Sequence, residues 1–232
     1  VASNQERTLK SKQLRSEHTR SKIIRATARV ISSRGLSAAT LEQITLESGI
    51  TTGAVYFHFK NRDAVINEVS EVASELFEKL IRNAIDPETD EMGNVIRVSA
   101  TLARKIAIDP IMQAGCRLLI TGEHIHSVDL AKAAKVAISS VSSKQNCVDN
   151  QTWNSFLHLF AGILTTHSVM NNWRKIPESL ELSWLTWLST SYEPSDISKY
   201  SKLTKTCFAN KELAFLDFNN SSQLQTSFQS PM

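Results

Sequence analysis

Hydrogen-bonding side chains gather in one short stretch of the sequence, Thr51–Arg62. Thr51 and Thr52 stand where a helix is predicted to begin, so their hydroxyls and free backbone N–H groups can meet a phosphate or a base edge. Gly53 has no side chain and lets that helix approach another backbone closely. The outward face then presents a phenol, an imidazole and an ammonium group, on Tyr56, His58 and Lys60. Together these groups predict a surface that contacts nucleic acid.

Each aromatic residue of this stretch would, taken singly, be explained as ordinary core packing, and His58 as a capping side chain. The elements around the stretch favour the DNA interpretation. Apolar residues at helical spacing predict a first helix from Thr19 that stops at Gly35. Thr40 and Gln43 form a capping-box pair that opens a second helix. Only a three-residue turn separates that helix from the third, which is the helix-turn-helix arrangement.

The charge of the chain is unevenly distributed. Residues 1–62 hold 11 Lys and Arg against four acids, a formal +7, whereas the whole chain carries +3 and the remainder therefore −4. A basic N-terminal part on an acidic body suits contact with a polyanion. A solvated helix face would show the same charge, so charge alone does not decide.

The scarcity of helix-breaking residues predicts an all-α fold of about nine helices, because the 232 residues include only 7 Gly and 5 Pro. After the second and third short helices, helical patterns cover about 62–82, 92–107, 110–123, 129–143, 152–172 and 179–191. We expect four regions along the chain. These are a flexible basic arm (1–17), a helix-turn-helix domain (18–62), a ligand-sensing and dimerisation domain (63–193) and a partly disordered C-terminal extension (194–232).

Other classes of function find little support. The three cysteines, Cys116, Cys147 and Cys207, are widely separated and form no C-x-x-C pair, so we expect no metal, no cofactor and no disulfide framework. Glu123, His124 and His126 do not share a helix face, so solvated histidines are favoured over a metal site. No nucleophile elbow or phosphate loop predicts an enzyme. No apolar run suggests a membrane span or signal peptide, so a cytoplasmic protein is expected.

The residues from Thr-Leu-Glu-Gln-Ile44 to Gly-Ile-Thr-Thr-Gly-Ala-Val-Tyr-Phe-His-Phe-Lys-Asn-Arg62 resemble the signature of the TetR family of bacterial transcriptional repressors, over about residues 18–66. The resemblance implies that residues of the second and third helices lie at the DNA. The DNA-binding set is therefore expected to be Thr40, Gln43, Thr51, Thr52, Gly53, Tyr56, His58, Lys60 and Arg62. Basic residues of the arm (Arg7, Lys12, Arg15) are candidates for added phosphate or minor-groove contacts.

A second segment, Asp109-Pro-Ile-Met-Gln-Ala-Gly-Cys-Arg-Leu-Leu119, resembles the γ-butyrolactone-type autoregulator receptors that control antibiotic production. The Ala161-Gly162 pair inside a late helix fits the same resemblance. One feature departs from it: those receptors carry a Trp over the ligand pocket in the following helix, and Val128–Val141 contains none. Recognition of the signal molecule is therefore expected to differ, or to have been lost.

The late helices carry more apolar surface than a lone chain would leave beside water. The family resemblance implies pairing with a second copy in a four-helix bundle; packing within one chain is the alternative. The expected dimer residues are Leu157, Leu164, Leu180, Trp184, Trp187 and Leu188. The expected lining of a pocket for a lipophilic molecule is Leu118, Leu119, Thr121, Trp153, Phe156, Phe160 and Thr165, each of which plain core packing would also explain.

The sequence thus predicts a homodimeric repressor that binds a palindromic operator and is released by a small lipophilic molecule, γ-butyrolactone-like or related. The helix over about 62–82 would touch both domains and transmit the signal. The alternative is a DNA-binding protein of the same fold with no small-molecule effector. Operator sequence, target genes, effector identity and the number of dimers per operator are beyond the sequence.

Overall fold

A computed structural model describes residues 2–122 and 150–209, and every regular element in them is helical. The predicted all-α class is thereby confirmed. The helices are α1 (Ala2–Arg34), α2 (Leu41–Ser48), α3 (Thr52–His58), α4 (Arg62–Ala84), α5 (Glu91–Ile108), α6 (Pro110–Thr121), α8 (Asn150–Val169), α9 (Ile176–Ser191) and α10 (Pro194–Ala209). Short 3-10 turns lie at Leu36–Ala38 and Trp173–Lys175. Within these residues no helix is long and apolar enough to cross a membrane.

Side-chain caps define the ends of the short helices where the sequence predicts them. The Thr40 hydroxyl accepts a hydrogen bond from the Gln43 amide at 3.2 Å and opens α2. Gly49 ends α2 in the left-handed region at φ 62°, which glycine adopts without steric cost. Thr51 caps α3 in the same way as Thr40 caps α2. Local sequence chemistry therefore sets the bounds of the short helices, and packing against α1 stabilises them.

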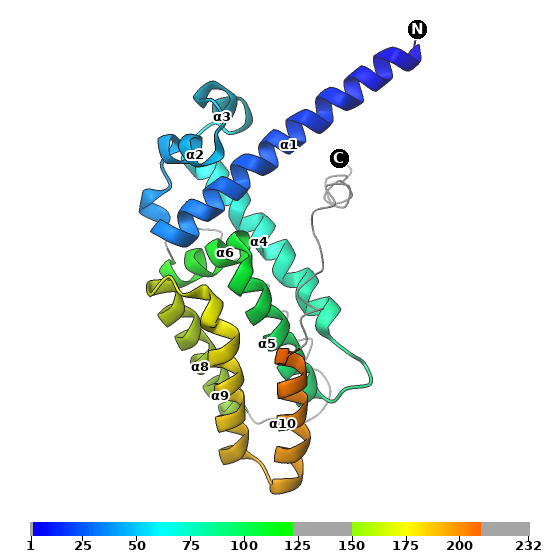
Figure 1. Ribbon diagram of the computed structural model, residues 1–232, viewed down its shortest axis with the longest axis vertical. Coiled ribbons are helices and arrows are strands. Elements are labelled where there is room, and N and C mark those ends of the chain that lie inside the picture. Colours follow the sequence, from blue (N-terminus) through cyan, green and yellow to red (C-terminus); the bar gives the residue numbers. More distant parts are fainter. Residues whose placement is uncertain (1, 123–149, 210–232) are drawn as a thin grey trace.

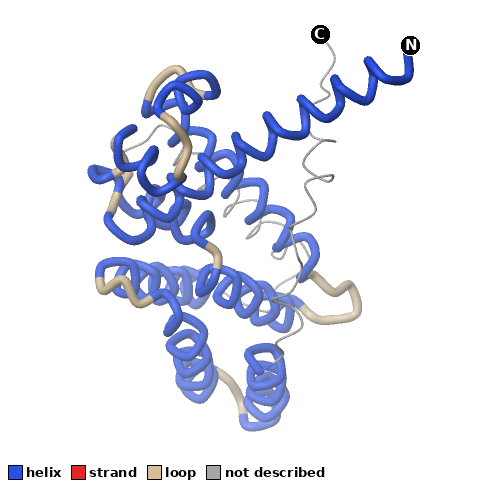
Figure 2. The backbone as a smooth tube through the Cα atoms, turned by 45° about the horizontal axis from the view of Figure 1, so that its top comes forward, coloured by secondary structure: helices blue, strands red, loops and turns tan. Residues whose placement is uncertain are grey.

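The first helix is longer than predicted. Residues 2–17, expected to form part of a flexible arm, continue α1 as one helix that projects from the body (Figures 1 and 2). This part has no apolar period because little of it is covered: Leu9 and Leu14 are 68% and 50% exposed. Its Gln, Glu, Arg, Leu and Lys residues are good helix formers, which explains a helix without an apolar stripe.

Two apolar cores lie one above the other along the molecule. The upper core joins α1, α2, α3, α4 and α6 through buried residues such as Ile23, Ile44 and Val65. The lower core joins the rest of α4 to α5, α8, α9 and α10. Leu76 and Phe77 of α4 pack against both cores. As expected for the helix over 62–82, α4 is thus shared by the two halves.

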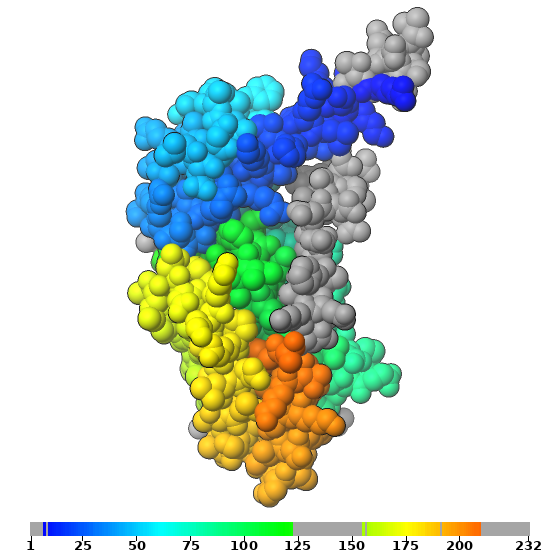
Figure 3. All heavy atoms as spheres, in the orientation of Figure 1, coloured from blue at the N-terminus to red at the C-terminus, as the bar shows by residue number. Residues whose placement is uncertain are grey.

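α10 belongs to the lower core, although the sequence analysis places residues 194–232 in a partly disordered extension. Figure 3 shows α9 and α10 side by side at the end of the molecule opposite the α1 arm. Tyr200, Cys207 and Phe208 are buried, and the Tyr200 hydroxyl donates to Asp90 at 3.2 Å. A short helix within 197–218 is compatible with the sequence, and α10 begins three residues earlier, at Pro194. Residues 210–232 and the predicted helix over 129–143 lie outside the described residues.

α9 corrects part of the expected dimer interface. Leu180, Trp184 and Leu188 are at most 1% exposed within a single chain, and Leu164 of α8 is also buried. The indole N–H of Trp184 donates to the Ser99 hydroxyl of α5 at 2.8 Å. The apolar stripe of α9 therefore faces α5 of its own chain, and only the opposite face of α9 is free for a partner. Trp187 and Leu157 are half-buried.

Truncation of Trp184 tests this assignment. We expect Trp184→Ala to lower the free energy of unfolding by about 3–5 kcal/mol, because it opens a cavity and removes the hydrogen bond from the indole to the Ser99 hydroxyl. Thr186→Ala, two residues away on the exposed face, is the matched control and should change it by less than about 0.5 kcal/mol. Urea unfolding at one fixed protein concentration measures both. Equal, small effects would place Trp184 at the surface.

Candidate nucleic-acid interface

The helix-turn-helix is fixed to α1 by polar contacts as well as by its core. Arg29 of α1 donates to the carboxylate of Glu47 in α2, with 2.7 Å between Nε and Oε1. Ile44 of α2 and Val55 of α3 are fully buried. With one face of each short helix covered in this way, the opposite face of α3 is held outward as a rigid surface.

Most of the predicted DNA-binding residues share that outward surface. Thr51, Thr52 and Gly53 are exposed at the start of α3, and Tyr56 is 53% exposed one turn further on. A Cβ built on Gly53 would meet nothing within 4 Å, so packing inside the chain does not require a glycine there. The bare backbone at this point serves an approach from outside. Lys60 is exposed just after the helix.

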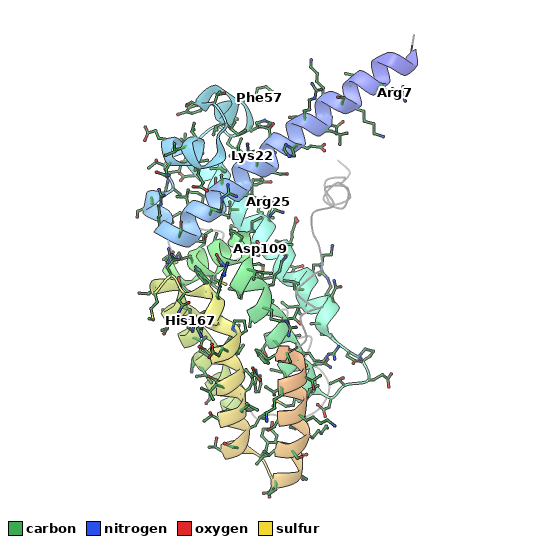
Figure 4. The ribbon with its side chains drawn as sticks, in the orientation of Figure 1. Arg7, Lys22, Arg25, Phe57, Asp109 and His167 are labelled. Carbon is green, nitrogen blue, oxygen red and sulfur yellow. The ribbon has the colours of Figure 1, made fainter. Side chains whose placement is uncertain are left out.

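Phe57 is a member of this surface that the predicted DNA-binding set leaves out. It is 81% exposed and stands at the outer tip of α3 (Figure 4). Its ring meets the His58 ring edge-on at 5.2 Å between centroids. The signal was available in the helical phase: Val55 and Phe59 face inward, and position 57 lies on the opposite side. An exposed phenyl group at a reading helix suits the methyl group of thymine.

His58 is half-buried behind Phe57. Burial, and then the positive charge of Arg20, lower the pKa of the His58 imidazole below its ordinary value of 6.5. At pH 7 the ring is therefore neutral, so it offers one hydrogen-bond donor and one acceptor rather than a cation. Arg20 itself forms an ion pair with Glu68 of α4 and lies over the Phe59 ring, 5.2 Å from its centroid.

Arg62, predicted at the DNA, is turned toward its own chain. Its Nε donates to the carbonyl of Ala39 at 2.9 Å and its Nη2 to that of Leu36 at 2.6 Å. Its Nη1 lies 3.4 Å from Asp63. These bonds fasten the turn between α1 and α2 to the start of α4. The sequence could not show this, because the acceptors are backbone groups 23 and 26 residues away.

The second helix offers its N-terminus to the same side. Thr40 is exposed, and Gln43, half-buried, supplies the amide that the Thr40 hydroxyl binds. The exposed side of α1 adds a basic stripe at helical spacing, which includes Arg15, Lys22 and Arg25. Arg7, Lys22 and Arg25 can be followed along this helix in Figure 4.

The predicted ligand-pocket residues do not come together. Leu118 is fully buried in the upper core, and Leu119 packs against that core too, whereas Phe160 packs against the lower one. Thr121 and Thr165 are exposed, with hydroxyls bonded to carbonyls of their own helices. The side chains of Trp153 and Phe156, like Glu123, His124 and His126, lie outside the described residues. Helical spacing alone could not tell which side of α6 meets α1.

Arg117 of α6 connects the two halves instead. Its Nη1 donates to the carbonyl of Ile31 at the end of α1 (3.2 Å), and its Nε to the Ser168 hydroxyl of α8 (3.1 Å). Its guanidinium also lies 5.9 Å from the centroid of the Trp173 ring. The Trp173 indole N–H in turn donates to the Ser32 carbonyl at 3.2 Å.

Comparison with known proteins agrees with this architecture. Residues 23–69 match the family described as bacterial regulatory proteins, tetR family. No curated protein matches the chain in sequence. Among solved structures, an ArpA-like γ-butyrolactone receptor is similar with a TM-score of 0.67 and 21% identity, over 83% of this chain and 98% of that one.

CprB from Streptomyces coelicolor, solved with its operator, gives a TM-score of 0.67 and 23% identity over 83% of this chain and 97% of its own. The TylP regulator of Streptomyces fradiae gives 0.57 and 18% over 82% and 96%. At these identities the likeness establishes the fold. The fold and the helix-turn-helix, together with the family match over residues 23–69, define a DNA-binding transcriptional regulator. Residues 23–69, which contain the helix-turn-helix, are those of the tetR family of bacterial regulatory proteins.

Two neighbouring cations test the roles assigned above. Arg62→Met removes two charge-assisted hydrogen bonds, so we expect a decrease of about 2–4 kcal/mol in the free energy of unfolding. Lys60→Met should leave that energy unchanged and instead lower the log–log salt slope of operator binding by about 0.9 for each phosphate that Lys60 neutralises. Urea unfolding and DNA titrations at several salt concentrations measure the two effects. An exchange of the two outcomes would reverse the roles.

Proposed function

We propose that the protein is a homodimeric repressor that binds a palindromic operator and leaves it when a small lipophilic molecule binds the C-terminal domain. The observation that carries the DNA-binding part is the outward face of α3, where Thr52, Gly53 and Tyr56 converge with Phe57. The residue set is that of direct readout: donors for base edges, a bare backbone and an apolar tip. Tyr56→Ala should remove specific binding while leaving the oligomeric state unchanged.

The proposed specificity of Phe57 has its own test. If its ring contacts a thymine methyl, replacing that thymine with uracil should weaken binding of the unaltered protein by about fourfold, the worth of one buried methyl-sized group. Phe57→Ala should bind the thymine and uracil operators equally, each more weakly. Titration of fluorescent duplexes with single replacements along the half-site measures this. Equal binding of all replacements by the unaltered protein would contradict the contact.

The homodimer is supported by the free faces of α8 and α9. α8 contains no Asp, Glu, Lys or Arg in its 20 residues. Its exposed side carries small or apolar residues, among them Ala161, Gly162, Thr165 and Val169, the last 78% exposed. Leu182 of α9 is 66% exposed. The uncharged strip of α8, together with the exposed Leu182 of α9, suits close packing against the same surface of a second copy.

Gly162 tests the interface. No atom of its own chain lies within 4 Å of a Cβ built there, so a side chain is tolerated by the monomer. Gly162→Glu should raise the dimer dissociation constant by at least about 100-fold, because it buries an unpaired charge. Thr206→Glu, on the exposed face of α10, is the control. Analytical ultracentrifugation measures both, and an unchanged dimer in Gly162→Glu would move the interface elsewhere.

Ligand control is supported by the connected cores and by the likeness to γ-butyrolactone receptors. A molecule that favours one packing of the lower core shifts α4 and α6, which also hold the reading head. The segment Asp109–Leu119 carries the sequence resemblance, and the Asp109 carboxylate caps α6 by accepting from the Ile111 amide at 2.9 Å. The proposed subfamily is therefore that of autoregulator receptors linked to antibiotic production. A binder without an effector is the alternative, and operator release assays with lipophilic extracts separate the two.

A further inference from the structure

Arg104 is a buried cation in the lower core. The residue is 8% exposed, and its Nε, Nη1 and Nη2 atoms are all buried without a hydrogen-bond partner. Arg62 and Arg117 show how the fold treats other arginines: each donates to backbone carbonyls. The five N–H groups of Arg104 therefore lie in the core without a hydrogen-bond acceptor. Native structures rarely leave such groups unsatisfied, so a missing acceptor is indicated.

Deprotonation of Arg104 does not remove this buried positive charge. Burial lowers the pKa of Arg104, but a guanidinium stays protonated in proteins. The neighbour that interacts with its charge is the Cys207 thiol of α10. Burial raises the pKa of Cys207 above its ordinary value, so the thiol is neutral at pH 7. The positive charge of Arg104 is therefore not balanced by Cys207.

The acids of α5 and α10 lie near the ends of these two helices. α10 lies along α5, with Lys199 paired to Asp90 and Leu203 close to Gly93 at the start of α5. Arg104 lies 14 residues beyond Asp90, about 20 Å along the helix. At the other end of α5, Asp109 pairs with Lys105 at 3.2 Å. In the described parts of α5 and α10, the carboxylates thus collect at the ends and leave Arg104 alone in the middle.

We propose that Arg104 binds the carboxylate of a lipophilic organic acid, and that this acid is the effector. The planar guanidinium fork matches a carboxylate with two parallel hydrogen bonds. One negative charge neutralises one positive charge, whereas a phosphate dianion would leave excess charge in the core. A lactone carbonyl is neutral and would leave the cation unbalanced. An apolar tail is favoured by the buried surroundings, which include Ala100, Ala103 and Phe208.

This inference rests on the proposed ligand response and narrows it from lipophilic molecules to lipophilic acids. Thermal unfolding of the full-length protein tests it with two probes that share a carbon count: decanoate, a carboxylate, and γ-decalactone, a neutral lactone. Acetate tests the carboxylate without a tail, and the straight-chain acids from hexanoate to tetradecanoate vary the tail. The variants are Arg104→Met, Arg104→Lys and, as a control, Arg82→Met on the exposed side of α4.

We expect at least one of the acids to raise the unfolding temperature of the unaltered protein and of Arg82→Met by about 5–10 °C at 100 times its dissociation constant. The lactone and acetate should give no comparable rise. Arg104→Met should lose the response and, without ligand, unfold at or above the temperature of the unaltered protein. Arg104→Lys, which keeps the charge but not the fork, should need at least about tenfold more acid.

Three results would overturn the site. These are no response of the unaltered protein to any acid in the series, an undiminished response in Arg104→Met, or a marked loss of stability in ligand-free Arg104→Met. An operator release assay with the same probes separates this inference from the proposed function. Binding of acid without release keeps the site and contradicts ligand control. Release by the lactone alone keeps ligand control and contradicts the site.

Discussion

Arg117 joins three parts of the chain that are far apart in sequence. One guanidinium donates to the end of α1, to the hydroxyl and the carbonyl of Ser168 in α8, and lies over the ring of Trp173, which itself bonds the end of α1. Burial lowers the pKa of Arg117, and the three acceptors and the ring offset the cost of removing its charge from water. This contact links the end of α1, which packs against the helix-turn-helix, to α8. The angle between the helix-turn-helix and the rest of the chain therefore depends on how α6 and α8 pack.

Two helices, α4 and α6, connect the upper and lower parts of the molecule directly. α4 carries Leu76 and Phe77 into both cores, and α6 packs its Leu118 face on α1 while Arg117 reaches α8. A rearrangement of the lower core therefore displaces elements that are also part of the upper core. Packed interiors have discrete arrangements rather than a continuum, so a small ligand-dependent change can select one orientation of α3. Arg104 lies in this lower core, where an added counter-charge would change the packing most.

On both α3 and α9 the helical spacing decides which side chains face inward, but the side chains left exposed differ between the two helices. On α3 the inward positions are Val55 and Phe59, and what remains outside is chemically specific: hydroxyls, a bare glycine, a phenol and a phenyl ring. On α9 the inward positions hold large side chains, including Trp184, and the exposed positions hold Leu182, Thr186 and Ser189, with Glu178 near the start of the helix. A reading surface needs distinctive groups, whereas a self-complementary interface needs groups that do not obstruct a second copy.

The sequence by itself determined the helical class, the short helices with their Thr and Gly boundaries, and the exposed face of α3, because each depends on residues within one or two turns. It did not reveal that Arg62 holds a loop, that Leu118 packs on α1, or that Trp184 belongs to the core of its own chain. The hydrogen-bond partners of Arg62 and Trp184 lie 23 to 85 residues away, and the buried α1 residues that share a core with Leu118 lie further still. The place of α10 was likewise decided by the tertiary packing that buries Tyr200, Cys207 and Phe208. Burial around Arg104 is a property of the assembled helices alone, since no local pattern distinguishes a buried arginine from an exposed one.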